Sequence, residues 1–250
     1  MKRYCFILAL VAVILASCSQ VERKEKKYVN SMKSSDYEEA TQAFDDFCNW
    51  VLKDHSTMTH DFKLMREEMD LNIAASKDGN LRCYSWPTNV GKGVKVYANI
   101  VQWKSGEHYG GFAGPIDQLL AGRKADIKRH RSMSHSIDTI YQLNNTKPTV
   151  YLIEQSYTTV NGKRRAYVSA TCIDGLVLRL LPFFFDGIEI AGNYEFYAKG
   201  KINDLFKWDE QTGRFYAYQT DDNDNVIPGK YIVYQLSGDR FTRVPEDNNN

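Results

Sequence analysis

TVYLIEQSYTTVNGKRRAYVSATCI (residues 149–173) decides the fold of this chain. Its two halves, 149–160 and 164–173, are rich in β-branched and aromatic residues and flank Asn161-Gly162. Asn-Gly between two such runs is the strongest short hairpin signal, because the tight turn needs positive φ at both central residues. We therefore expect two antiparallel strands joined at Asn161-Gly162.

Further runs with strand character lie on both sides of this hairpin and are separated by turn signals such as Asp78-Gly79 and Asp174-Gly175. We assign strands to residues 81–86, 94–103, 176–181, 188–197, 214–219, 230–236 and 240–244. Successive strands joined by short turns form antiparallel meanders. The predicted fold is α+β and β-dominated, an antiparallel meander in the form of a curved sheet or a partly closed barrel.

One amphipathic helix is predicted before the strands. Apolar residues recur at three- and four-residue spacing between residues 36 and 54, and Ser35 or Asp36 can cap the first turn. Such an apolar stripe must pack on another surface, and we expect this N-terminal helix to cover one face of the sheet. Phe62–Met69 is a second, shorter helical candidate.

The predicted domain spans residues 36–245. Residues 18–35 are polar and charged, which is typical of a flexible tether, and residues 246–250 are expected to form a disordered tail. Residues 104–136 lack β alternation and are rich in Gly and charge. They are interpreted as a long loop that is functional, mobile or a misassigned element, and a division of the chain near 104–136 is the alternative to one domain.

The start of the chain has the features of a secretory signal, a basic head followed by the short apolar run 6–16. The run closes with Leu15-Ala16-Ser17-Cys18, which resembles the lipobox of bacterial lipoproteins. The resemblance implies that residues 1–17 are removed and that Cys18 is lipidated, typically with palmitate. An ordinary signal peptide cut near Ala16 is the alternative. Two acyl chains anchor a protein stably, so the membrane is the expected partner.

A second resemblance concerns KDGNLRCYSW (residues 77–86), which is similar to a strand motif in uncharacterised envelope lipoproteins of Bacteroidota. It implies no activity. Ser19 is not an Asp-type retention signal, so the outer membrane is the expected location. The run Ser19–Arg23 departs from the surface-export signal of that group, and both a periplasmic and a surface-facing position stay open.

The charge balance argues against one class of protein. A nucleic-acid binder normally carries a clear basic excess, whereas the net charge of this chain is +1.

After Cys18 is lipidated, the mature chain keeps Cys48, Cys83 and Cys172, an odd set with no metal-type spacing. Whether any of them pair is open, although apolar neighbours favour buried thiols for Cys48 and Cys172. The basic cluster 123–131 is interpreted as a solvated loop.

Catalytic and cofactor signatures are absent from the sequence. It contains no G-x-S-x-G, H-E-x-x-H, P-loop or G-x-G-x-x-G motif, and we assign no catalytic and no cofactor-binding residue. Asp221, Asn223 and Asn225 match the start of a calcium loop, but Val226 stands where Gly is needed and Ile232 where Glu is needed. A solvated loop explains this segment.

One weak metal pattern remains, because His55, Met58 and His60 share the spacing H-x-x-M-x-H with His130, Met133 and His135. Imidazole and thioether ligands together suit copper. However, positions i and i+5 do not share a helix face, so two polar segments that agree by chance explain the pattern, and we assign no metal site.

Aromatic residues give the last lead. Sixteen Tyr and four Trp are many for 250 residues. Those on predicted strands are Tyr84, Trp86, Tyr97, Trp103, Tyr151, Tyr157, Tyr167, Tyr194, Tyr197, Tyr216, Tyr218, Tyr231 and Tyr234. Strand propensity explains most of them, but rings on a sheet can also form a face for sugars, peptides or apolar ligands.

These patterns favour a lipid-anchored cell-envelope protein that binds an unknown ligand or envelope partner without catalysis. The alternatives are a lipid-anchored hydrolase acting on glycan or peptide and, third, a copper-handling protein. Two carboxylates about 5–10 Å apart in a cleft would favour the hydrolase. A contiguous aromatic patch without them would favour binding.

Overall fold

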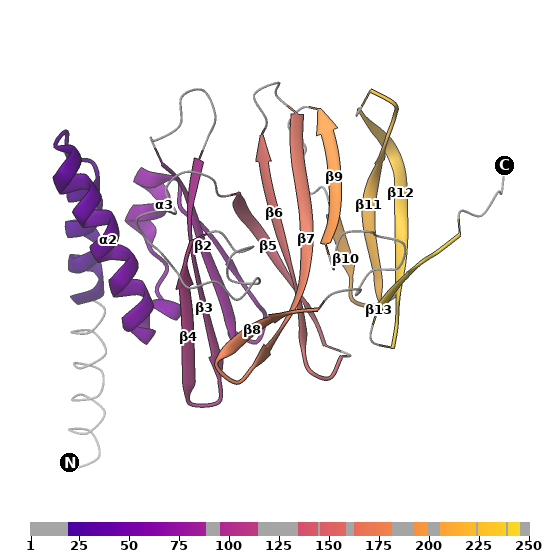
Figure 1. The fold of residues 1–250 in the computed structure, drawn as a ribbon, viewed down its shortest axis with the longest axis horizontal. Helices are drawn as coiled ribbons and strands as arrows, with labels where there is room; N and C mark the ends of the chain where they lie inside the picture. The colour runs from indigo at the N-terminus through magenta and orange to yellow at the C-terminus, as the bar shows by residue number, and fades with distance from the viewer. Residues whose placement is uncertain are drawn as a thin grey trace, which may run out of the picture. The chain divides into compact units, whose positions relative to one another are not determined.

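The two strands predicted around Asn161-Gly162 pair as expected. In the computed structural model, β6 (Val150–Thr158) and β7 (Lys163–Asp174) are antiparallel, with a register that runs from Val150↔Cys172 to Thr158↔Arg164. They lie side by side in Figure 1. The described residues are 20–88, 96–114, 135–144, 146–158, 163–181, 193–199, 206–223, 225–238 and 240–245, so Asn161-Gly162 lies outside them.

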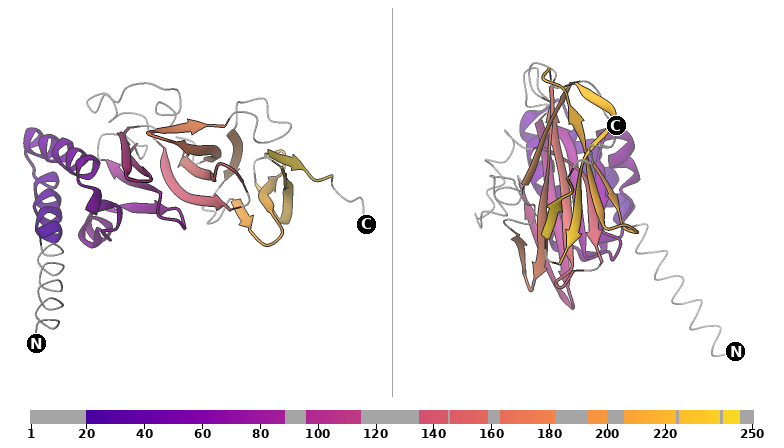
Figure 2. Two further views of the ribbon diagram at one scale, coloured as in Figure 1. Left: turned by 90° about the horizontal axis from the view of Figure 1, so that it is seen from below. Right: turned by 90° about the vertical axis from the view of Figure 1, so that its right-hand side faces the viewer.

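The hairpin is the middle of a five-stranded sheet, called here the central sheet. β5 (Ser136–Leu143) pairs with β6 on one side. The other edge of β7 is shared by β9 (Asn193–Lys199), along residues 163–169, and by β8 (Val177–Leu180), along residues 171–174. Figure 2 shows the strong curvature of these strands, which was predicted as a curved sheet.

The first sheet precedes the central sheet in the chain and has the order β1-β2-β3-β4. Its strands are β1 (Asn72–Ala75), β2 (Leu81–Thr88), β3 (Val96–Ser105) and β4 (His108–Ala113). β4 lies inside 104–136, so the interpretation of that segment as a misassigned element is confirmed for residues 108–113. Gly110 of β4 pairs with Trp103, and a Cβ at position 110 would collide with the Trp103 ring. Glycine is therefore needed in this strand, and because it has no side chain it interrupts the alternating pattern by which a strand is recognised.

The last sheet has the order β10-β11-β12-β13. Its strands are β10 (Phe206–Asp209), β11 (Arg214–Thr220), β12 (Val226–Ser237) and β13 (Arg240–Arg243). The register between β11 and β12 shifts between Tyr218 and Thr220, which marks a bulge at the end of β11.

The central sheet is buried on both faces because the side chains of β6 alternate between two cores. Val150 and Leu152 belong to a core with Phe215 and Phe241 of the last sheet. Tyr151 and Ile153 belong to a second core with residues of the first sheet such as Leu81, Val101 and Trp103. The fold is thus β-dominated and antiparallel, and within the described ranges the three sheets stay open rather than closing into a barrel.

A polar latch joins the first and central sheets. The Tyr151 hydroxyl donates to Asp78 Oδ2 at 2.8 Å, and the Asp78 amide donates to Gln142 Oε1 at 2.9 Å. Burial opposes ionisation of Asp78, but hydrogen bonds from Ser76, the Asn80 amide and Tyr151 outweigh it and lower its pKa. Burial and the same hydrogen bond raise the pKa of Tyr151. The latch therefore favours the ionised carboxylate form of Asp78.

The chain divides into two compact units, Met1–Leu71 and Asn72–Asn250, called here the helical unit and the β unit. The helical unit contains a helix over residues 20–32, then α2 (Tyr37–Lys53), η1 (His55–Met58) and α3 (Lys63–Met69). The two predicted helices are therefore present, and Asp36 caps α2 by accepting from the Glu38 and Glu39 amides.

The helix at 20–32 replaces the flexible tether expected for 18–35. Val29 and Glu25 are buried, with exposed fractions of 1% and 2%. Tyr28 stacks on Trp50 of α2 at 5.4 Å between ring centroids, so the apolar stripe of α2 packs against this helix. Tertiary packing makes a charged segment helical here, which its composition did not reveal. No helix among the described residues has the length and apolarity needed to cross a membrane.

Candidate functional site

The six residues of the weak H-x-x-M-x-H pattern are placed separately by the structure or lie outside the described residues. His60 Nε2 lies 2.8 Å from the buried Glu25 carboxylate, and Met58 is buried in the helical unit. The ring nitrogens of His135 contact the Tyr167 hydroxyl, and His55 is exposed at the start of η1. His130 and Met133 lie outside the described residues. Among those that are described, no group of three His, Cys, Asp or Glu could hold a metal ion.

The three remaining cysteines are free and buried. Burial raises the pKa of the Cys83 thiol. Burial also raises the pKa of the Cys172 thiol, and the positive charge of Arg179 opposes this only in part. A raised pKa keeps a thiol protonated, which is the opposite of what a nucleophile needs. Cys18 lies outside the described residues.

The acidic loop uses its carboxylate to hold its own backbone. Asp221 Oδ1 accepts from the amides of Asn223 and Asn225 at 2.9 and 2.8 Å, and Asp221 Oδ2 accepts from the Asn225 side chain. These contacts explain the clustering of turn-forming residues as loop structure.

The structure separates the predicted strand aromatics, of which Tyr97, Tyr157 and Tyr167 are half-buried outside the cavity described below. Tyr84, Trp86, Trp103, Tyr151 and Tyr234 are buried, as strand propensity implies, while Tyr216, Tyr218 and Tyr231 line a cavity. The side chains of Tyr194 and Tyr197 lie outside the described residues. A subset of the predicted strand aromatics is thus gathered at one place.

That place is the aromatic groove, a cavity of about 480 Å³ in the β unit between β5 and strands β10 to β12. The lining residues are Thr139, Tyr141, Phe206, Lys207, Trp208, Tyr216, Tyr218 and Tyr231. Tyr218 and Tyr231 lie on paired strands, with ring centroids 4.6 Å apart, and the Tyr231 hydroxyl donates to that of Tyr218 at 3.1 Å. Tyr216 meets Tyr231 edge to face at 5.8 Å.

The groove rests on the core of the last sheet. Phe206 stacks on Phe215 at 5.4 Å, and Trp208 meets Phe241 edge to face at 5.7 Å. Phe215 and Phe241 are fully buried, which fixes the rings on the inner side of β10. Phe206 and Trp208 were not among the predicted strand residues, although the alternation in Phe206-Lys207-Trp208-Asp209 is the signal that could have identified β10.

Among the described residues of the groove lining, Lys207 is the one ionisable side chain besides the tyrosines. Its ammonium group lies 5.9 Å from the Tyr216 ring centroid. A buried carboxylate lies next to the lining: the Tyr141 hydroxyl is 2.8 Å from Glu154 Oε2 and 3.2 Å from the Phe206 carbonyl oxygen. The Trp208 indole nitrogen is buried and has no hydrogen-bond partner in the part of the chain that the structure describes.

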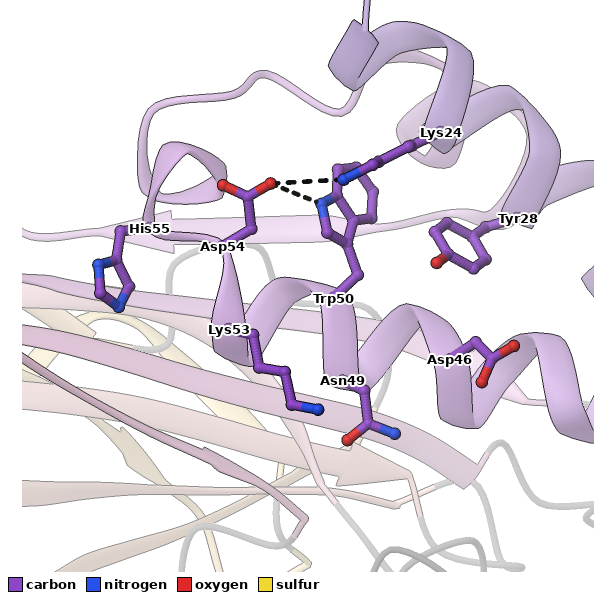
Figure 3. A pocket seen from close by; sticks show the side chains of 8 residues that line it. All are labelled: Lys24, Tyr28, Asp46, Asn49, Trp50, Lys53, Asp54 and His55. Carbon is purple, nitrogen blue, oxygen red and sulfur yellow. Dashed lines mark hydrogen bonds and ion pairs between the residues drawn. The ribbon is translucent and has the colours of Figure 1, made fainter.

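A second cavity, the helical cavity, lies in the helical unit and has a volume of about 460 Å³. Lys24, Tyr28, Asp46, Asn49, Trp50, Lys53, Asp54 and His55 line it, and all are labelled in Figure 3. Lys24 and Tyr28 come from the helix at 20–32 and face Trp50 of α2. Asp54 Oδ2 accepts from the Trp50 indole at 3.0 Å and lies 3.7 Å from the Lys24 ammonium group.

The helical cavity carries charges of both signs. Burial opposes ionisation of Asp54, but hydrogen bonds from Ser56 and Trp50, with the charge of Lys24, outweigh it and lower its pKa. Burial, and then the negative charge of Asp46, raises the pKa of Tyr28. Mixed charges over an aromatic pair can receive a ligand that itself carries both charges.

No protein-family model matches the chain, and no curated protein aligns with it significantly. The two cavities therefore have to be interpreted from their own chemistry.

Proposed function

We propose that this chain is a lipid-anchored envelope protein whose β unit binds a saccharide in the aromatic groove without catalysing a reaction. The observation that carries the proposal is the groove itself, a cavity of about 480 Å³ with six aromatic side chains in its lining. Ligand sites of roughly 300–1,000 Å³ typically combine apolar walls with a few polar groups.

Saccharides match this lining better than apolar ligands do. A sugar ring presents C–H groups on its faces and hydroxyls around its edge, so it can stack on the rings of Tyr218 and Tyr231 and hydrogen-bond to their hydroxyls. A purely apolar ligand would leave these polar groups without partners, which costs free energy.

Binding is favoured over hydrolysis because the described lining has no carboxyl group. A glycosidase generally needs two carboxyl groups, about 5 to 10 Å apart, that reach the bond to be broken. Glu154 lies behind Tyr141 and is held by its hydroxyl, and it is 4% exposed. A single buried carboxylate in this position fits a structural role for Glu154, which is to hold the Tyr141 ring in place.

The anchor in this proposal is Cys18, and its support is the lipobox Leu15-Ala16-Ser17-Cys18. The outer membrane is the proposed location. Cys18→Ala is expected to release the protein from the membrane fraction, and unchanged retention would contradict the anchor. Protease added to intact cells separates a surface-facing domain, which is digested, from a periplasmic one, which is protected.

The binding test is a glycan array followed by titration calorimetry with the glycans that bind. Tyr218→Ala and Tyr231→Ala are expected to weaken binding about tenfold or more, because truncating an aromatic residue that anchors a ligand typically costs about 2 kcal/mol or more. Tyr37→Ala is the matched control, since Tyr37 is 69% exposed on α2 and outside the groove. Glycan binding that survives both groove substitutions, or no glycan binding at all, would contradict the proposal.

A further inference from the structure

The helical cavity has charged residues of both signs in its lining, and the chain length limits how far it can lie from Cys18. Residues 20–24 are helical and span about 6 Å, and the chain from Cys18 to Gln20 can span at most about 7 Å more. The Cα of Lys24 therefore lies within about 13 Å of the Cα of Cys18. If Cys18 carries the lipid, the cavity lies at or next to the headgroup layer of the bilayer.

The aromatic part of the cavity suits that position. Trp50 contacts two residues of the helix at 20–32: the Tyr28 ring, stacked at 5.4 Å, and the Lys24 ammonium group, 5.6 Å from the Trp50 ring centroid. Trp, Tyr and Lys are the residues that membrane proteins place at the boundary between headgroups and acyl chains. The cavity has all three on two adjacent helices (Figure 3).

The charges in the cavity specify the headgroup. Asp54 already neutralises Lys24, whereas Lys53 has no ion-pair partner among the described residues. Asp46 lies two turns before Lys53 on the same face of α2, and Asn49 lies between them. One available cation and one carboxylate along a single helix match a headgroup that has one phosphate and one amine.

We propose that the helical cavity binds the headgroup of phosphatidylethanolamine, with the phosphate at Lys53 and the amine at Asp46. The inference rests on the proposed lipid anchor at Cys18. The bound headgroup would hold the helical unit against the membrane that the acyl chains anchor. Anionic lipids without an amine would leave Asp46 facing a like charge, and this disfavours them.

The test is photo-crosslinking in living cells whose membranes contain both phosphatidylethanolamine and phosphatidylglycerol. A photoreactive amino acid replaces Asn49 in the full chain, and lipid adducts are identified by mass spectrometry. The control position is Glu67, which is exposed on α3 and outside the cavity. We expect phosphatidylethanolamine adducts from position 49 in clear excess over position 67.

A charge variant then tests the contact with the phosphate. Lys53→Gln is expected to lower the adduct yield at position 49 about fivefold, the size that one basic residue near a lipid surface contributes. Lys63→Gln is the matched control, because Lys63 is an exposed lysine of α3 outside the cavity. An unchanged yield with Lys53→Gln would contradict the proposal.

The remaining outcomes separate this inference from the proposed anchor. Equal adducts at positions 49 and 67 would reflect proximity to the bilayer alone and would overturn the site, as would phosphatidylglycerol or protein adducts in place of phosphatidylethanolamine. If the membrane-bound protein gives no lipid adducts while the Cys18→Ala variant is released from the membrane, the headgroup site is overturned and the anchor stands. A wild-type protein that is not membrane-bound would overturn both.

Discussion

The two cavities have nearly equal volumes, about 460 and 480 Å³, but different supports. The helical cavity combines apolar packing, with Tyr28 stacked on Trp50, and polar contacts between helices, the Lys24–Asp54 pair and the buried Glu25–His60 pair. The aromatic groove is held by apolar packing beneath the last sheet, where Phe206 and Phe215 stack. Acid and salt should therefore act on the first cavity more than on the second, and loss of core volume should be the main way to disturb the second.

The largest expected effect comes from removing the floor of the groove. Phe215→Ala empties a fully buried site and is expected to destabilise the β unit by about 3–5 kcal/mol. Tyr216→Ala, one residue along β11, removes a half-buried ring that lines the groove and should cost about 1 kcal/mol or less. Denaturant unfolding followed by hydrogen exchange of the strands measures both. Similar losses from the two variants would mean that the groove is not built on a separate core.

The second effect belongs to the helical unit. Glu25 accepts from the Met65 amide at 2.9 Å and contacts His60 at 2.8 Å while its side chain is 3% exposed. Glu25→Ala leaves both partners without this carboxylate and is expected to cost about 3 kcal/mol. Hydrogen exchange should speed up in α3 and in residues 20–32 and stay unchanged in the sheets. Glu22→Ala is the control, because Glu22 is exposed on the same helix, and an equal effect there would contradict a role for burial.

Local sequence signals predicted the parts of the molecule that short-range chemistry determines. Asn161-Gly162 and its flanking runs predicted β6 and β7 to within a few residues, and the spacing of Phe47 and Trp50 predicted α2 with Asp36 as its cap. These elements can be predicted from their own sequences, because turn residues and apolar periodicity determine structure within a few positions.

Long-range packing decided what the sequence could not. The helix at 20–32 depends on partners such as Phe47 and Trp50, some 20 residues away, and its own composition resembles a tether. The groove was half predicted: Tyr216, Tyr218 and Tyr231 were candidates, but Tyr141 and Phe206 join them only because β5 meets the last sheet. A strand pattern says which face a ring occupies and not which distant strand it meets.

A smaller effect should follow from acid. Asp54 and Asp78 have pKa values lowered from 3.8, so each contributes stability above pH 3.8 that is lost as pH falls through its folded pKa. Both are partly open to solvent, and Asp54→Asn or Asp78→Asn is expected to cost about 1 kcal/mol at pH 7. Below the folded pKa each variant should match the wild type. Hydrogen exchange should place the first loss in the helical unit and the second in the sheets, and a pH-independent difference would contradict the assignment.

The smallest effect tests whether the Lys24–Asp54 pair stabilises the helical cavity at all. The two side chains are 43% and 34% exposed and 3.7 Å apart, so solvent screens their attraction. Lys24→Gln is expected to cost about 0.5 kcal/mol or less at low salt and less still at high salt. Asp54 keeps the Trp50 indole and Ser56 as donors, so the η1 cap should survive, and tryptophan fluorescence should change little. A loss well above this size, insensitive to salt, would mean that Lys24 acts through packing on Trp50 rather than through charge, because its stem and ammonium group also cover that ring.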